Sequence, residues 1–211
     1  MAKGSSYERK VCDDLSDWWT GKPKSSVFWR TSNSGGRATI RRKKGMVTSG
    51  HCGDIGAVDE VGLPLVRLIT IEVKRGYSTE VFTDVFDYLH TTKPGIFEGF
   101  VSQAKEAAKN AGTPFWMLIH RRDRREPMVY MPWKLYDELL DHGAFGGGEV
   151  QVIPFARTIV GVRKKKREMT VIIPTKIVAV KLEDFLQCTT APMIRNLYKA
   201  YASKLKRYGN E

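Results

Sequence analysis

Hydrophobic residues recur near the start of the chain at spacings that predict one helix and one short strand. Over residues 7–19 the large apolar side chains repeat at the helical period, and Gly21 and Pro23 follow where such a helix would end. Residues 27–31 predict a strand. Residues 32–50 are rich in Ser, Gly, Arg and Lys and have no apolar period, so a long loop is expected there.

The next two apolar stretches predict an antiparallel hairpin. Residues 53–59 and 67–74 are rich in strand-forming side chains, and Gly62, Leu63 and Pro64 between them are typical of a turn. In a hairpin centred on Leu63, alternate residues of the second strand face a core and the others share the opposite face. The core-facing set would be Ile69, Ile71 and Val73.

The rest of the chain predicts further helices and strands. Helices are expected over residues 78–89, 97–111, 133–140 and 194–205, and strands over 115–120, 127–131, 155–162, 169–173 and 176–180. The glycine-rich residues 143–148 predict a break. Mixed strands and helices of this kind are typical of the α/β class, and we expect one domain with a C-terminal extension.

The overall charge indicates a polyanionic partner. The 211 residues include 35 Lys and Arg against 23 Asp and Glu, a formal net charge of +12. The basic residues cluster at 41–44, 121–125 and 163–167. Nucleic acid is the simplest reason for such runs, and solvated surface turns are the alternative.

Several classes of protein are disfavoured by the composition. No apolar run approaches the roughly 20 residues of a membrane span, and the first residues lack the apolar stretch of a signal peptide. The three cysteines are widely spaced without a CxxC pair, which favours free thiols over disulfides or structural zinc. We therefore expect a cytoplasmic protein without a membrane partner, and we expect its five tryptophans in the core.

Two charged residues in the apolar strand are the first candidates for a site. Glu72 and Lys74 interrupt a run of strand formers, and burying charge is costly unless it is paired or bound to metal. In the predicted hairpin Asp54 lies opposite Glu72, and Lys74 shares their face. Carboxylates about 4 Å apart repel by roughly 4 kcal/mol, and Mg²⁺ or Mn²⁺ would turn that repulsion into attraction. A simple ion pair of Lys74 with either carboxylate is the alternative.

At these residues the sequence resembles the PD-(D/E)xK nuclease superfamily. Gly53-Asp54, followed after one strand by Glu72-Val73-Lys74, is similar to its D…ExK core, with Gly53 at the place of the proline that names the motif. The resemblance implies a restriction-endonuclease-like core with a central mixed sheet flanked by helices. It also implies Mg²⁺ or Mn²⁺ held by Asp54, Glu72 and the Val73 backbone carbonyl, with Lys74 assisting the attacking water.

Further segments extend the resemblance over about residues 5–120. Glu8 in the first helix resembles a glutamate that completes the metal site, and a carboxylate favoured by the helix dipole is the alternative. Gln103 resembles a glutamine that reaches the site from the helix after the ExK strand; otherwise it is a polar residue at a helix edge. Residues 29–36, WRTSNSGG, resemble the R…GS-type loop of the archaeal Holliday-junction resolvases.

These likenesses imply a metal-dependent DNA endonuclease with a core over residues 1–132 and an extension of unknown role over 133–211, packed on the same domain. A homodimer selective for branched DNA such as Holliday junctions is expected within that class. A restriction-like or repair nuclease of the superfamily is one alternative, and a non-catalytic DNA-binding protein is an alternative of another class. The residues expected to contact DNA are Arg30, Ser34, Arg37, Arg41, Arg42, Lys43, Lys44 and Arg75.

Overall fold

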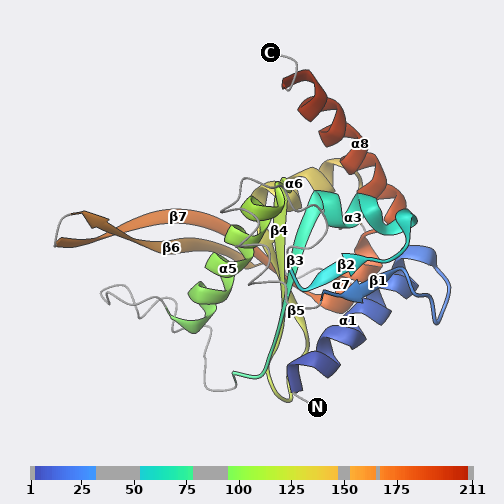
Figure 1. Ribbon diagram of the computed structural model, residues 1–211, viewed down its shortest axis with the longest axis horizontal. Coiled ribbons are helices and arrows are strands. Elements are labelled where there is room, and N and C mark those ends of the chain that lie inside the picture. The colour runs from blue at the N-terminus through green and yellow to red at the C-terminus, as the bar shows by residue number, and fades with distance from the viewer. Residues whose placement is uncertain (1–2, 32–52, 78–94, 147–152, 165–166, 209–211) are drawn as a thin grey trace.

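The computed structural model describes residues 3–31, 53–77, 95–146, 153–164 and 167–208 (Figure 1). The loop expected over residues 32–50 and the helix expected over 78–89 lie outside these ranges.

A five-stranded mixed β-sheet forms the centre of the fold, in the order β3-β4-β5-β7-β6. Strands β3 and β4 are parallel, and all other neighbours are antiparallel. The predicted α/β class with a central mixed sheet is confirmed, and it is consistent with a restriction-endonuclease-like fold. The strands are β3 (Ile69–Arg75), β4 (Phe115–Arg121), β5 (Met128–Pro132), β6 (Ile153–Lys164) and β7 (Arg167–Lys181).

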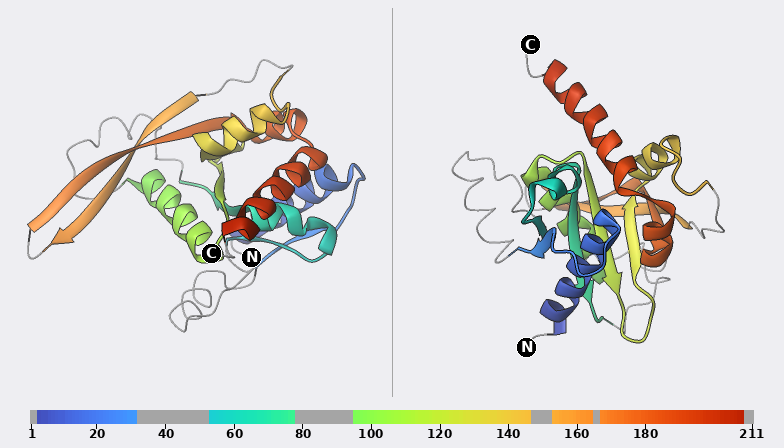
Figure 2. Two further views of the ribbon diagram at one scale, coloured as in Figure 1. Left: turned by 90° about the horizontal axis from the view of Figure 1, so that it is seen from above. Right: turned by 90° about the vertical axis from the view of Figure 1, so that its right-hand side faces the viewer.

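Helices cover both faces of this sheet (Figures 1 and 2). One face packs against α5, and the other against α1, α3, α6, α7 and α8. Among the described helices, none is both long enough and apolar enough to span a membrane. The helices are α1 (Lys3–Thr20), the single-turn η1 (Glu60–Gly62), α3 (Leu63–Leu68), α5 (Ile96–Ala111), α6 (Trp133–Asp141), α7 (Leu182–Cys188) and α8 (Ala191–Tyr208).

The predicted hairpin centred on Leu63 is wrong. Residues 63–68 form α3, whose first turn contains Pro64, and the following strand begins at Ile69. The preceding strand β2 (Ile55–Ala57) forms a separate two-stranded sheet with β1 (Phe28–Arg30). Proline is as well suited to the first turn of a helix as to a β-turn, because it has no N–H to leave unpaired there.

Alternation along β3 nevertheless gives the side-chain directions that the sequence predicts. Ile69, Ile71 and Val73 lie in the larger core cluster, as expected. Glu72 and Lys74 alternate with them and contact α5 on the other face of the sheet. Since β3 is an edge strand of the main sheet, these two charged side chains lie at its border.

A buried serine attaches the small β1–β2 sheet to the first helix. The Ser16 hydroxyl accepts hydrogen bonds from the backbone N–H groups of Val27 and Phe28, at 3.1 and 3.0 Å, and donates to the Cys12 carbonyl at 2.7 Å. It therefore satisfies two buried backbone donors just before β1. This contact fixes the segment that leads into Arg30.

Four of the five tryptophans pack as expected, and one does not. Trp19 and Trp116 are buried, and Trp18 and Trp133 are partly buried against the core. Trp29, in contrast, is 46% exposed. The residue before it in β1 is buried, so strand alternation turns Trp29 outward. Cys12 and Cys188 are free thiols, and Cys52 lies outside the described residues.

The C-terminal part has one longer strand and one more helix than the sequence predicts. The strands expected over 169–173 and 176–180 are both parts of the single strand β7, and α7 was not predicted. Strand β7 pairs with β5, so residues beyond Pro132 complete the central sheet.

Candidate active site

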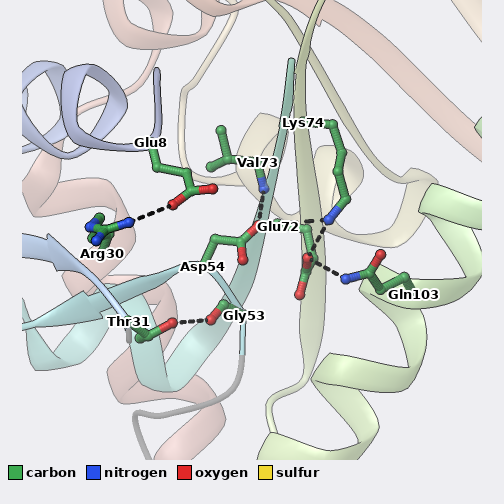
Figure 3. Close-up of polar contacts among 9 residues, drawn as sticks. All are labelled: Glu8, Arg30, Thr31, Gly53, Asp54, Glu72, Val73, Lys74 and Gln103. Atoms are coloured by element: carbon green, nitrogen blue, oxygen red, sulfur yellow. Dashed lines mark hydrogen bonds and ion pairs between the residues drawn. The ribbon is translucent and has the colours of Figure 1, made fainter. Parts of the chain in front are cut away.

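Asp54 is held at the edge of β3 by backbone contacts. Its N–H donates to the Ile71 carbonyl at 2.8 Å, and one carboxylate oxygen, Oδ2, accepts the Val73 N–H at 2.8 Å (Figure 3). From the other side, the Thr31 N–H donates to the Asp54 carbonyl at 2.9 Å. The predicted neighbourhood of Asp54 and Glu72 is therefore present, although the predicted hairpin is not.

Gly53 makes this placement of Asp54 possible. Its φ is +84°, and it is buried. A Cβ at this position would lie 2.7 Å from the Ile71 backbone oxygen and 2.8 Å from the Thr70 Cγ2 atom. Proline is fixed near φ −65° and cannot adopt this backbone. The departure from the motif's proline thus has a structural reason.

Glu72 is a buried carboxylate that accepts hydrogen bonds from two side chains. It is 3% exposed, and its Oε2 atom accepts from the Lys74 Nζ at 3.2 Å and from the Gln103 Nε2 at 3.0 Å (Figure 3). The pKa of Glu72 is raised from its ordinary 4.5 to about 7, first by burial and then by the Asp54 charge, against the lowering effect of Lys74. One lysine does not compensate the carboxylate pair.

Lys74 lies between the two carboxylates and α5. Its Nζ atom lies 3.9 Å from the Asp54 Oδ2 atom and 3.2 Å from the Glu72 Oε2 atom. The ion pairs that were the alternative to a catalytic role for Lys74 are therefore present. The ammonium group also lies 5.9 Å from the centre of the Phe100 ring. Phe100 and Gln103 are three residues apart on α5, a spacing that puts both on one helix face. The sequence predicted that Gln103 reaches the site, whereas the contact of Phe100 with Lys74 was not predicted.

Glu8 lies on the Asp54 side of the site. Its Oε2 atom is 3.6 Å from the Arg30 Nη1 atom, and burial followed by the Asp54 charge raises the pKa of Glu8. Figure 3 shows Glu8 entering from α1, opposite to Gln103. The structure thus brings Glu8 and Arg30 to the site as an ion pair.

Of the other predicted DNA contacts, Arg75 packs on an aromatic ring, and the rest lie outside the described residues. The Arg75 guanidinium lies 5.9 Å from the centre of the Tyr7 ring, at the end of β3. The predicted contacts Ser34, Arg37, Arg41, Arg42, Lys43 and Lys44 fall in residues 32–52, which the structure does not describe.

The donor set of the site fits a hard divalent cation. In the described part of the chain, no three His, Cys, Asp or Glu side chains form a metal-binding group, but Asp54 and Glu72 are two carboxylates that share the Lys74 ammonium. Mg²⁺ is commonly held by one or two carboxylates and otherwise by water and substrate phosphate, which suits a pair. The raised pKa of Glu72 is the second indication, because a nearby cation would favour its charged form.

Restoring the motif's proline is expected to damage the fold. Gly53→Pro and Gly53→Ala should each lower the free energy of unfolding by about 2–5 kcal/mol, because a positive φ and a backbone clash must both be relieved. Gly99→Ala in α5 is the control: a Cβ there meets no atom within 4 Å, and the change should stabilise by about 0.5–1 kcal/mol. Urea unfolding measures all three. A Gly53→Pro variant as stable as the parent would contradict this account of Asp54.

Comparisons with known proteins identify the family. A family model described as phage putative PDDEXK endonuclease matches residues 1–195, which extends well beyond the segment that carries the motif resemblance. The match is to this family and not to the archaeal Holliday-junction resolvases, so the narrower likeness is not supported. No curated protein and no solved structure gave a match. With the family model covering most of its length, the chain belongs to the phage PDDEXK endonuclease family of the PD-(D/E)xK superfamily.

Proposed function

We propose that this protein is a divalent-metal-dependent endonuclease that hydrolyses phosphodiester bonds of DNA. The observation that carries the proposal is the buried Glu72 beside Asp54, in a chain of an endonuclease family. Mg²⁺ or Mn²⁺ would be held by these two carboxylates, with the Val73 carbonyl as a further ligand. When bound, the ion would activate water and neutralise charge that develops on the phosphate.

The residues of the chain have separate roles in this proposal. The Val73 N–H orients Asp54, and Gln103 orients Glu72 through its amide. Lys74 supplies an ammonium group that donates to a phosphate oxygen as negative charge builds there. Glu8 adds negative charge near Asp54 and is held by Arg30.

DNA as the substrate is supported by the family and by charge. The net charge of +12 favours binding to a polyanion, and the strand edge leaves the carboxylate pair at the border of the sheet. A preference for branched DNA and a homodimer stay predictions that rest on the motif resemblance. Cleavage of a four-way junction and a linear duplex of the same sequence, side by side, tests the first, and the molar mass in solution tests the second.

Removing one carboxylate charge is the direct test of the proposed site. Asp54→Asn keeps the oxygen that accepts the Val73 N–H but loses the charge that a cation needs. Cleavage in Mg²⁺ should fall by at least about 10²-fold, with the Kd for DNA within a few-fold of the parent. Asp59→Asn, at an exposed helix cap, is the control and should cleave normally. An Asp54→Asn variant with full activity would remove Asp54 from the site.

Lys74 is tested by separating chemistry from stability. Lys74→Met removes the ammonium group, and Lys74→Arg replaces a compact charge by a larger fork. Both should lower the single-turnover rate at saturating enzyme, Lys74→Met by about 10²–10³-fold, with DNA affinity largely kept. Lys109→Met on the same helix as Gln103 is the exposed control. A Lys74→Met variant that cleaves at the parent rate but melts much lower would make Lys74 a structural ion-pair partner only.

The raised pKa of Glu72 predicts a pH-dependent response to metal. The folded protein keeps the Glu72 proton up to about pH 7, whereas an unperturbed glutamate releases it near 4.5. In the metal-free protein this contribution to stability is therefore present below pH 4.5 and lost as the pH rises through about 7. Mn²⁺ binds the charged carboxylate, so its stabilising effect should increase as the pH rises.

The measurement is the rise in Tm caused by Mn²⁺, which should be small near pH 5.5 and large near pH 8. Glu72→Gln should abolish this rise at both pH values. Glu98→Gln is the matched control, since Glu98 is also buried and glutamine can replace it in the capping box of α5. An equal response to Mn²⁺ in Glu72→Gln and in the parent would exclude Glu72 as a ligand.

A further inference from the structure

The long strands β6 and β7 extend beyond the central sheet as a two-stranded ribbon. Only residues 177–181 of β7 pair with β5, whereas residues 167–173 and 176 pair with β6 alone. Figures 1 and 2 show this ribbon projecting from the body of the protein on the side where α5 lies. The ten residues 167–176 at about 3.3 Å each give it a reach of roughly 33 Å.

A break in the strand register marks the base of the ribbon. The pairing shifts between Ala156 and Thr158, where β7 passes through residues 173–176. Such bulges bend a strand and increase its twist. The ribbon therefore leaves the plane of the sheet at a defined point.

The described end of the ribbon carries three residues of one of the basic runs of the sequence. Lys164 pairs with Arg167 at the last described position, and Arg163 pairs with Glu168 next to it. Placing three cations beside one acidic residue at the end of a thin ribbon concentrates like charge. A two-stranded ribbon standing alone is also only marginally stable. The concentrated positive charge favours a polyanionic partner at the tip, and the marginal stability of an isolated ribbon favours a partner that contacts it.

We propose that the β6–β7 ribbon is a DNA-binding arm, in which Arg163, Lys164 and Arg167 contact phosphates of duplex DNA outside the segment that is cleaved. This inference rests on the proposed function for its choice of partner. A two-stranded ribbon fits the major groove of B-DNA, about 12 Å wide, and phosphate contacts at its tip would set the position of the duplex. The reach of the ribbon is close to one turn of B-DNA, which is about 34 Å.

The test is binding of a 30-base-pair duplex in EDTA, measured at several salt concentrations. Neutralising the tip with R163Q/K164Q/R167Q should raise Kd at least about tenfold and make the slope of log K against log salt shallower by about 2.7, the value for three phosphate contacts. The charge-conserving R163K/K164R/R167K should bind like the parent.

A matched variant controls for the loss of three positive charges. K22Q/K24Q/K199Q removes exposed cations from the segment after α1 and from α8, on the other side of the protein from the ribbon, and should change Kd less than about twofold. Equal weakening by both triple variants would overturn the arm, because net charge alone would then explain binding. If the tip variant changed the molar mass in solution but not the DNA affinity, the DNA-binding arm would also be overturned. The ribbon would then be a contact between copies of the chain.

Single-turnover cleavage in Mg²⁺ separates this inference from the proposed function. Normal Kd in the tip variant, with cleavage by the parent, overturns the arm and leaves the endonuclease proposal in place. A tenfold loss of binding in the tip variant, with no cleavage by the parent, supports the arm and overturns the endonuclease proposal. A fall in the cleavage rate at saturating tip variant would place the ribbon in the reaction itself and overturn a purely DNA-positioning arm.

Discussion

The site depends on the hydrogen bond between the Val73 N–H and the Asp54 carboxylate. Strand β3 is at the edge of the main sheet, so the backbone groups on its outer side have no neighbouring strand to pair with. Asp54 uses two of them, the Ile71 carbonyl and the Val73 N–H. In an interior strand both groups would form hydrogen bonds with the neighbouring strand. The edge position therefore allows a second carboxylate to lie beside Glu72.

The sequence predicted the proximity of Asp54, Glu72 and Lys74 better than the path of the chain between them. Strand alternation alone put Glu72 and Lys74 on one face and three aliphatic residues on the other, which is a local property. The path between Asp54 and β3 is not local. Gly62, Leu63 and Pro64 fit a turn and a helix start equally well, and the buried positions of α3 that select the helix are known only from tertiary packing. Asp54 lies beside β3 with either path, so its position was predicted correctly although the hairpin was wrong.

Gly53 shows why a motif is better judged by backbone geometry than by residue identity. The superfamily's proline and this glycine do opposite things to φ, yet both can precede an aspartate that meets the ExK strand. Here the chain arrives with φ +84° and within 2.7 Å of the Ile71 oxygen, measured from where a Cβ would be. Only glycine satisfies both conditions. Sequence inspection alone records the change as a departure from the pattern, whereas the structure shows that it preserves the position of Asp54.

The charge balance explains why Lys74 is both an ion-pair partner and a candidate for chemistry. Three carboxylates, from Glu8, Asp54 and Glu72, meet two cations, Arg30 and Lys74, and Arg30 is paired with Glu8. Lys74 is a counter-ion to both Asp54 and Glu72, and the pKa of Glu72 nevertheless stays raised. In the proposed reaction a divalent cation would neutralise that pair, and the Lys74 ammonium would then be able to donate to a phosphate oxygen. The ion pairs of Lys74 are therefore compatible with its proposed role in cleavage.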